Sequence, residues 1–265
     1  TTLNGEGLQH EDGHSHVLAA TNPAVVAYDP AYGYEIGHIV KDGLRRMYGD
    51  DPENVFYYLT MYNEPYVQPA EPEGVDAEGI VRGLHLLSPA DPAAEGPRAQ
   101  VLASGVAVPW ALEAQRLLRE EWGVHADVWS VTSWTELRRD GLDADKHNLL
   151  DPTGEQRTAY VTQRLAGRPG PVVGVSDYVR ELQDMIRAWI PSDYATLGTD
   201  GWGMSDTRGA LRRHFLVDAE SITVQTLARL AAAGEFDHSR LREAIDRYRL
   251  DDPAAADAGN TEGSG

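Results

Sequence analysis

The sequence predicts an α/β fold, and three observations support this. Two short apolar runs, Ala24–Tyr28 and Val55–Tyr62, are rich in aromatic and β-branched residues, as buried strands are. Between them, apolar residues recur at helical spacing from Tyr32 to Met47: Ile36, Ile39, Val40, Leu44 and Met47. Strand, helix and strand over about forty residues form a βαβ unit, so we expect the two strands to be parallel.

A second block of strands and helices begins at Ala99. We expect strands at residues 99–104, 124–131, 172–175 and 194–197, and helices at 110–122, from 134 onward, and at 206–215, 218–233 and 239–248. We also expect Asp177 to cap a helix that carries Val179 and Leu182, and Ser205 or Asp206 to cap the helix that follows residue 203.

Residues 71–98 change character and are expected to link two domains. This stretch is rich in proline and acidic residues, which favours a connection over the surface, interrupted by a short helix at Ala77–Leu87. The predicted organisation is therefore a first domain over residues 1–70, the linker, and a second domain over residues 99–250. The remaining residues 251–265 are mostly Ala, Asp, Gly and Ser and are expected to be disordered.

Composition excludes several classes of function. The net charge of −19 argues against binding to nucleic acid or to an anionic membrane surface, both of which require Lys and Arg. The chain has no Cys, which excludes disulfides, thiolate metal sites and a thiol nucleophile. No apolar run approaches the length of a membrane span. A cytoplasmic protein is the expectation that fits these features.

The segment Thr1–His16 carries the densest group of titratable side chains. It holds Glu6, His10, His14 and His16 among glycines, so we expect an irregular loop, where functional residues concentrate. Glu6 and His10 are four residues apart and could face one cavity; a surface or structural role is the alternative for both. The pattern H-x3-H-x-H allows a metal site, but its spacing matches no standard zinc motif. Hydrogen bonding within the loop and to a dimer neighbour is the favoured interpretation for these histidines.

Polar pairs also follow both strands of the βαβ unit. These pairs are Tyr28-Asp29 and Asn63-Glu64, and the carboxyl ends of strands are where α/β sheets place their sites. Structural roles are the alternative for both pairs.

Five stretches resemble one family, the homodimeric pyruvate dehydrogenase E1 component, in family order along nearly the whole chain. They are TTLNGEGLQHEDGHSH (1–16), YDPAYGYE (28–35), DGLRRMYG (42–49), SVTSWTELRRDG (130–141) and LGTDGWGMSDTR (197–208). The resemblance implies that the chain is the C-terminal portion of such an enzyme. It implies the later half of a thiamine-diphosphate-binding domain of the pyrimidine type. A transketolase C-terminal-like domain then follows, with a small mixed sheet and covering helices.

The resemblance also implies a reaction and partners. The parent enzyme decarboxylates pyruvate and passes the acetyl group to the lipoyl arm of E2, the dihydrolipoyl acetyltransferase, as one subunit of an E1 homodimer. By resemblance, His10 and Glu6 are active-site residues, His10 near the cofactor and the bound pyruvate and Glu6 in an acid network. The ligands of thiamine diphosphate and magnesium are expected upstream of Thr1, so the chain alone is expected to be inactive.

Residues 198–203 depart from the cofactor signature of thiamine enzymes. That signature is Gly-Asp-Gly with a downstream Asn, and here no Asn follows before Asn260. The loop also lacks the Lys and Ser/Thr of a P-loop. We therefore expect a tight turn from strand to helix. Another thiamine enzyme, such as a transketolase or a different 2-oxo acid dehydrogenase E1, and a non-catalytic assembly module are the alternative functions.

Overall fold

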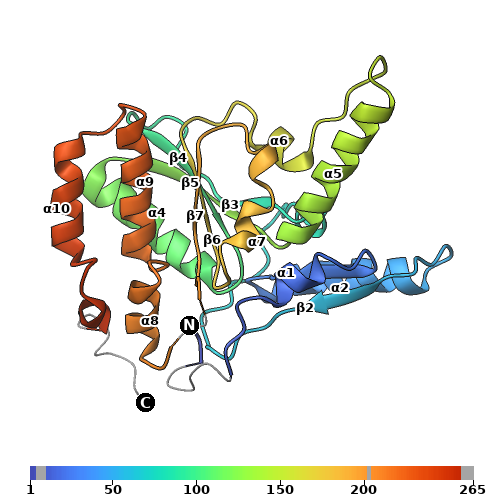
Figure 1. Cartoon of the computed structure of the whole chain (residues 1–265), viewed down its shortest axis with the longest axis horizontal. Helices are drawn as coiled ribbons and strands as arrows, with labels where there is room; N and C mark the ends of the chain where they lie inside the picture. The colour runs from blue at the N-terminus through green and yellow to red at the C-terminus, as the bar shows by residue number, and fades with distance from the viewer. Residues whose placement is uncertain (4–9, 202–203, 258–265) are drawn as a thin grey trace.

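The computed structural model describes residues 1–3, 10–201 and 204–257, and its sheets and helices confirm the α/β prediction (Figure 1). Strands β1 (Val25–Tyr28) and β2 (Phe56–Leu59) pair in parallel, Val25 opposite Phe56 and Tyr28 opposite Leu59. A five-stranded sheet follows, in the order β3-β5-β4-β6-β7. Among the described residues, no helix is long and apolar enough to cross a membrane.

Helix α2 (Gly33–Tyr48) connects β1 to β2 and packs on them. Its side chain Ile39 is fully buried with Val26 and Tyr28 of β1. Gly43 lies against Tyr57 of β2, where an added Cβ would be 3.1 Å from the ring. The short helix α1 (Ser15–Ala19) precedes β1. The predicted βαβ unit is therefore present, with β2 shorter than the run 55–62.

The five-stranded sheet is mixed. Its strands are β3 (His85–Ser88), β4 (Arg98–Ala103), β5 (His125–Ser130), β6 (Val172–Val175) and β7 (Tyr194–Leu197). β3 runs antiparallel to β5, and the other neighbours are parallel.

Helices cover both faces of this sheet (Figure 1). One face carries α4 (Ala107–Trp122), α9 (Ala219–Ala232) and α10 (His238–Tyr248), and the other carries α5 (Trp134–Leu150), α6 (Tyr160–Leu165) and α7 (Glu181–Asp184). Alternate residues of β4 supply the two cores: Val101 and Ala103 lie in the first, and Leu102 lies in the second. A further helix, α8 (Arg208–His214), precedes α9.

A fully buried carboxylate, Glu35, joins the two sheets. It belongs to α2, and its Oε2 accepts from the backbone N–H groups of Ala31 (2.7 Å) and Tyr32 (3.0 Å). Its Oε1 contacts Nε2 of His85 in β3 (2.7 Å) and accepts from the hydroxyl of Ser130 in β5 (2.6 Å). Such a group is stable inside a protein only when its oxygens are hydrogen-bonded, and here both are.

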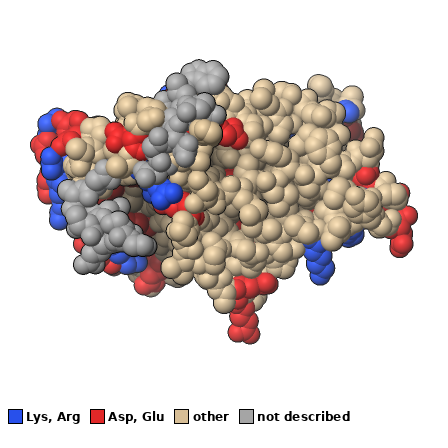
Figure 2. Space-filling model, turned by 90° about the horizontal axis from the view of Figure 1, so that it is seen from below, with Lys and Arg blue, Asp and Glu red and all other residues tan. Residues whose placement is uncertain are grey.

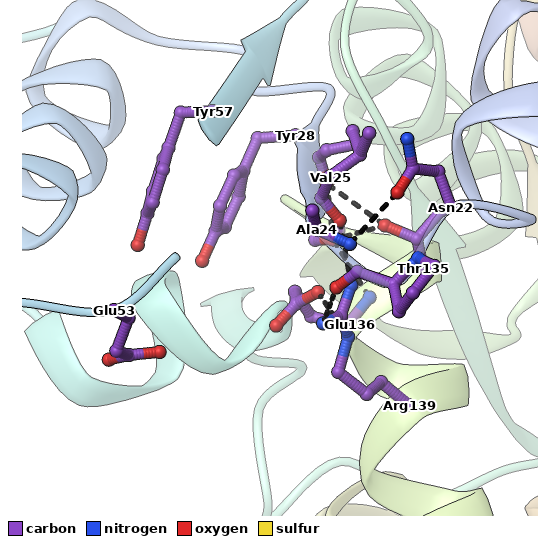
Figure 3. A network of polar contacts seen from close by, with 12 residues as sticks. Asn22, Ala24, Val25, Tyr28, Glu53, Tyr57, Thr135, Glu136 and Arg139 are labelled. Atoms are coloured by element: carbon purple, nitrogen blue, oxygen red, sulfur yellow. Dashed lines mark hydrogen bonds and ion pairs between the residues drawn. The ribbon is translucent and has the colours of Figure 1, made fainter. Parts of the chain in front are cut away.

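A second junction binds α5 to the start of β1 (Figure 3). The Arg139 guanidinium donates to the carbonyl oxygens of Pro23 (2.9 Å) and Val25 (2.7 Å), and lies 3.1 Å from Glu136. Burial raises the pKa of Glu136, and Arg139 opposes that change. The Tyr28 and Tyr57 rings stack beside it with centroids 5.7 Å apart. The two sheets are therefore fixed to each other at several points.

The expected helix at 77–87 is wrong in its second half. Helix α3 (Ala77–Arg82) ends at Gly83, which adopts a left-handed conformation with φ of 101°. The chain then forms β3, whose pairing with β5 compensates for the lost helical hydrogen bonds. Tertiary pairing overrides the local preference here.

Two expected helix caps and the expected tail differ from the structure. Asp177 caps no helix, because the chain turns at 176–180 and α7 begins only at Glu181. Thr207 caps α8 by accepting from the N–H of Ala210 (3.2 Å), in place of Ser205 or Asp206. In the tail, Pro253–Asp257 forms a short 3-10 helix beside α8, stabilised where Asp252 accepts from the N–H of Ala254. Residues 258–265 lie outside the described part of the chain.

Candidate functional site

Polar residues stand immediately after the parallel strands of both sheets. Asp29 follows β1, Thr60 follows β2, Ser104 follows β4 and Ser176 follows β6. The carboxyl ends of parallel strands meet at one edge of a sheet, and this edge is where α/β proteins build their sites. All four residues are buried.

A hollow of about 440 Å³ opens beside these strand ends. Its described lining comes from the N-terminal segment, the residues after β2, the turn after β6, the segment after β7, and α8 with the residue that follows it. The lining residues are Thr1, Thr2, Leu3, His10, Glu11, Asp12, Gly13, His14, Tyr58, Leu59, Thr60, Met61, Tyr62, Asn63, Asp177, Tyr178, Thr199, Gly201, Leu211 and Phe215.

Asp29 lies directly behind the wall of this hollow. Its Oδ1 accepts from the hydroxyls of Thr60 (2.8 Å) and Tyr62 (2.7 Å), both of which line the hollow. Its Oδ2 accepts from the Ser104 hydroxyl (2.7 Å), which itself accepts from the indole N–H of Trp134 (3.0 Å). Burial raises the pKa of Asp29, while His16 and the three hydroxyl donors favour the carboxylate.

His16 is the buried histidine of the N-terminal segment, with 3 % exposure. Its Nε2 lies 2.9 Å from the Thr60 hydroxyl. Its ring meets the rings of Tyr178 and Tyr58 edge-on, with centroids 4.9 and 5.6 Å apart, and both tyrosines line the hollow. Burial lowers the pKa of His16, and the carboxylates of Asp29 and Asp12 partly oppose that change.

The residues predicted from sequence have different locations. His10 is exposed and lines the hollow together with His14, whereas His16 is buried behind it. Glu6 lies outside the described residues, so its proximity to His10 stays a prediction. Within residues 1–3, 10–201 and 204–257, no three His, Cys, Asp or Glu side chains are grouped so as to hold a metal ion.

The N-terminal segment is attached to the second sheet and to α8. The Thr1 hydroxyl donates to Asp177 Oδ1 (2.8 Å), and the Arg208 guanidinium donates to the Thr2 carbonyl oxygen (3.0 Å). Glu64, one of the polar residues after β2, forms an ion pair with Arg212 of α8. Asp177 therefore helps to form the hollow, which is the role that the sequence did not indicate for it.

The loop after β7 makes a tight turn in its described part. An added Cβ at Gly198 would lie 2.4 Å from the Tyr178 carbonyl oxygen, so only glycine fits this approach. Asp200 accepts from the backbone N–H of Arg180 (2.9 Å) and from its Nε (2.5 Å), which joins the loop to the turn after β6. Residues 202 and 203 are outside the described part.

Sequence reasoning missed several members of the site. No sequence motif contains Thr60, Tyr62 or Tyr178. Because their neighbours in the sequence are apolar, they were assigned to predicted strands or helices and not to a site. The one available signal was their position, because each lies at or just past the carboxyl end of a strand, as Asp29 does. The strand-end position was used for Asp29 and for Asn63-Glu64, of which Asn63 lines the hollow, but not for Thr60, Tyr62 or Tyr178.

The charged side chains that line the hollow determine which ligands can bind there. Its described lining includes Glu11, Asp12 and Asp177 and no Lys or Arg. A diphosphate group with magnesium needs cationic side chains or a grouped set of metal ligands. No Lys or Arg lines the described hollow, and the described residues hold no group of three His, Cys, Asp or Glu side chains that could bind a metal ion. The hydroxyl, imidazole and carboxyl groups present suit a small polar molecule that accepts and donates hydrogen bonds.

Two sequence families match the chain. Residues 1–69 match the family described as the pyruvate dehydrogenase E1 component middle domain. Residues 83–218 match the family described as the transketolase-like TK C-terminal domain.

Curated relatives agree with these matches. The chain is 57% identical over 256 residues to the pyruvate dehydrogenase E1 component of Mycolicibacterium smegmatis, covering 97% of this chain and 27% of that protein. It is 55% identical to that of Mycobacterium tuberculosis, covering 99% and 28%, and 46% identical to that of Escherichia coli K12, covering 95% and 28%. The chain thus spans just over a quarter of the length of these relatives.

Solved structures show the same fold at low sequence identity. Transketolase from Leishmania mexicana superposes with a TM-score of 0.57 at 18% identity, over 87% of this chain and 29% of that one. Transketolase from Pichia stipitis in complex with sedoheptulose-7-phosphate gives a TM-score of 0.59 at 18% identity, over 89% and 29%. On these matches the chain belongs to the pyruvate dehydrogenase E1 family, of which it corresponds to the C-terminal portion, with a transketolase-like C-terminal domain.

Proposed function

We propose that this chain is the part of a thiamine-diphosphate-dependent pyruvate dehydrogenase E1 that forms the substrate side of the active site. The observation that carries the proposal is the position of His10 at the hollow beside the carboxyl ends of both sheets, in a chain 57% identical to an E1 component. When bound in the complete enzyme, thiamine diphosphate would supply the nucleophilic carbon and the electron sink for a 2-oxo acid. His10 would donate a hydrogen bond to the carboxylate or carbonyl oxygen of pyruvate.

The acidic lining supports a division of labour between this chain and the sequence that precedes it in the relatives. The diphosphate and magnesium would be held by that upstream sequence, because a multiply charged diphosphate with its metal needs cationic side chains or grouped metal ligands, and no Lys or Arg lines the described hollow. Glu6 would belong to the acid network near the cofactor. The domains proposed for this part are residues 1–70 and 99–250 with 71–98 between them, although β3 (His85–Ser88) within that connection belongs to the second sheet through its pairing with β5.

The proposed role of His10 is testable in a full-length E1 that contains this chain. His10→Ala is expected to lower kcat/KM for pyruvate by roughly 10²- to 10⁴-fold, the usual contribution of a positioned proton donor. His38→Ala is the matched control, because His38 lies on α2 and pairs with Glu71 (3.0 Å), away from the hollow. Equal losses in both variants, or no loss with His10→Ala, would refute the role.

The chain alone is expected to bind no cofactor. Titration calorimetry of thiamine diphosphate with magnesium into residues 1–265 is expected to give no binding heat, and pyruvate is expected to be left unchanged. Micromolar binding would overturn the division of labour proposed above. Substitutions in the Gly198–Gly203 loop and at His10 would then be the first variants to test for cofactor binding.

A structural neighbour supports an inactive but assembled state for the isolated chain. The protein described as "Split gene transketolase, inactive beta4 tetramer" has a TM-score of 0.56 over 84% of this chain and 63% of its own length. We propose that the isolated chain likewise self-associates without activity. In the cytoplasm, the complete E1 would pair with a second E1 and deliver acetyl groups to the lipoyl arm of E2. Light scattering during size-exclusion chromatography tests the self-association, and a monomer at micromolar concentration would contradict it.

A further inference from the structure

The buried acid Asp29 is connected to the hollow through hydroxyl groups. It is 1 % exposed, and the hydroxyls of Thr60 and Tyr62, which line the hollow, both donate to its Oδ1. The close approach of Gly105 seals this corner, since an added Cβ would lie 2.5 Å from the Tyr62 hydroxyl and 2.6 Å from Asp29 Oδ1.

The Thr60 hydroxyl decides where the proton of His16 resides. A hydroxyl has one proton to donate. The Asp29 carboxylate, 2.8 Å from the Thr60 hydroxyl, is the charged acceptor within its reach, whereas the Tyr28 carbonyl oxygen is farther away at 3.3 Å and the Tyr178 hydroxyl, which also contacts Thr60, is neutral. The Thr60 oxygen is then an acceptor toward Nε2 of His16, 2.9 Å away. A neutral imidazole that donates from Nε2 leaves a lone pair on Nδ1.

We propose that Asp29 is a positioning residue of the hollow, which orients the Thr60 and Tyr62 hydroxyls in its wall and, through Thr60, holds the proton of His16 on Nε2. The negative charge of Asp29 thereby acts on the hollow without being exposed to it. The aromatic rings of Tyr58 and Tyr178, which line the hollow, pack on the same imidazole. Only the identity of the ligand in the hollow, a 2-oxo acid, rests on the proposed function.

The groups around His16 determine how its pKa responds to the loss of the Asp29 charge. Among the described residues, the charged or titratable groups that face it are Asp29 and Asp12, which favour the imidazolium, and the neutral Tyr58 and Tyr178. Removing the Asp29 charge must therefore lower the pKa of His16 further. Burial already keeps that pKa below its ordinary value.

The second buried acid, Glu35, provides a matched control. Like Asp29 it is fully buried and accepts from a hydroxyl at the end of a strand of the second sheet, Ser130. Its partners do not include Thr60, Tyr62 or His16. Asp29→Asn and Glu35→Gln each replace a carboxylate with an amide of the same shape, so both are expected to destabilise the fold.

The test is nuclear magnetic resonance of the 265-residue chain labelled with ¹⁵N at histidine. Long-range ¹H–¹⁵N spectra are expected to show His16 protonated on Nε2 near pH 7. Asp29→Asn is expected to lower the His16 titration midpoint and to populate the Nδ1–H tautomer, whereas Glu35→Gln is expected to change neither. Protonation on Nδ1 in the unmodified chain, or equal effects of the two variants, would overturn the proposal.

A conservative pair covers the case in which Asp29→Asn fails to fold. Thr60→Ser keeps the hydroxyl and is expected to keep the Nε2–H tautomer, while Thr60→Val removes it and is expected to lose the tautomer preference. Identical spectra for the two Thr60 variants would exclude the relay. None of these measurements requires cofactor binding or turnover, so failure of the proposed function would leave their outcome unaffected.

Discussion

At the scale of single residues, the buried His16 makes stability depend on pH in a defined direction. Burial lowers the pKa of His16 in the folded state. Below the ordinary histidine pKa of about 6.5, the unfolded chain binds a proton that the folded chain resists, so the stabilisation present at neutral pH is lost as the pH falls. His16→Gln is expected to flatten this loss in urea unfolding between pH 7.5 and 5, because an amide does not titrate. His38→Gln, at a half-buried histidine of α2, is the control and should keep the slope of the unmodified chain. An unchanged slope in His16→Gln would contradict the prediction.

Another single residue, Ser133, has two structural roles. Its side chain caps α5 by accepting from the N–H of Glu136 (3.0 Å), and its hydroxyl donates to the Ala27 carbonyl oxygen of β1 (2.5 Å). Ser133→Ala is expected to cost about 2–3 kcal/mol of unfolding free energy, the loss of a cap plus a buried hydrogen bond. Asp237→Ala, which removes only an exposed cap on α10, is expected to cost about 1 kcal/mol. Chemical denaturation measures both, and equal costs would show that the bond to β1 contributes nothing.

At the scale of elements, glycines fix the turns at the two ends of α4. Gly105 and Gly123 both adopt left-handed conformations, with φ of 51° and 67°. An added Cβ at Gly123 meets nothing within 4 Å, so Gly123→Ala is expected to cost only the backbone strain of about 1 kcal/mol. Gly105→Ala also pushes on Tyr62 and Asp29 and is expected to cost roughly 3 kcal/mol in total. Thermal unfolding compares the two variants. Equal shifts in Tm would mean that Tyr62 and Asp29 move away from the added Cβ at little energetic cost.

Elements were predictable from sequence where one physical pattern dominates. The periods of α2 and α4 and the apolar runs of β1, β4 and β6 were sufficient to place them, because burial of one face decides their form. The helix expected at 77–87 failed because β3 gains its stability from pairing with β5, which local sequence does not encode. Asp177 was likewise predicted to cap a helix, and in the structure it accepts a hydrogen bond from the Thr1 hydroxyl instead. Of the candidate site, His10 was predicted from its polar segment and by resemblance and lines the hollow, and its catalytic role stays a prediction. Thr60 and Tyr62 required the spatial arrangement of two strand ends.

At the scale of the whole molecule, the first sheet is incomplete as a folding unit. A parallel sheet of two strands has little stability of its own and normally has both faces covered. Here Val40, Leu44 and Tyr48 form one exposed face of α2, and Phe56 of β2 is 52% exposed. The surface seen from below, over α1, α2 and β2, carries few charged side chains although the net charge is −19 (Figure 2). Exposed apolar side chains grouped in this way favour association.

This face predicts how the isolated chain behaves in solution. The double change Tyr48→Lys and Phe56→Lys is expected to reduce self-association, because two charges at an apolar surface and a strand edge oppose pairing. The free energy of unfolding is expected to stay within about 1 kcal/mol, since both side chains are exposed. Leu149→Lys is the control, because Leu149 is also exposed, at 79%, but lies near the far end of α5 (Figure 1). Light scattering over a concentration series measures the effect. If Leu149→Lys reduced association as strongly as the double change, net charge rather than this face would govern it.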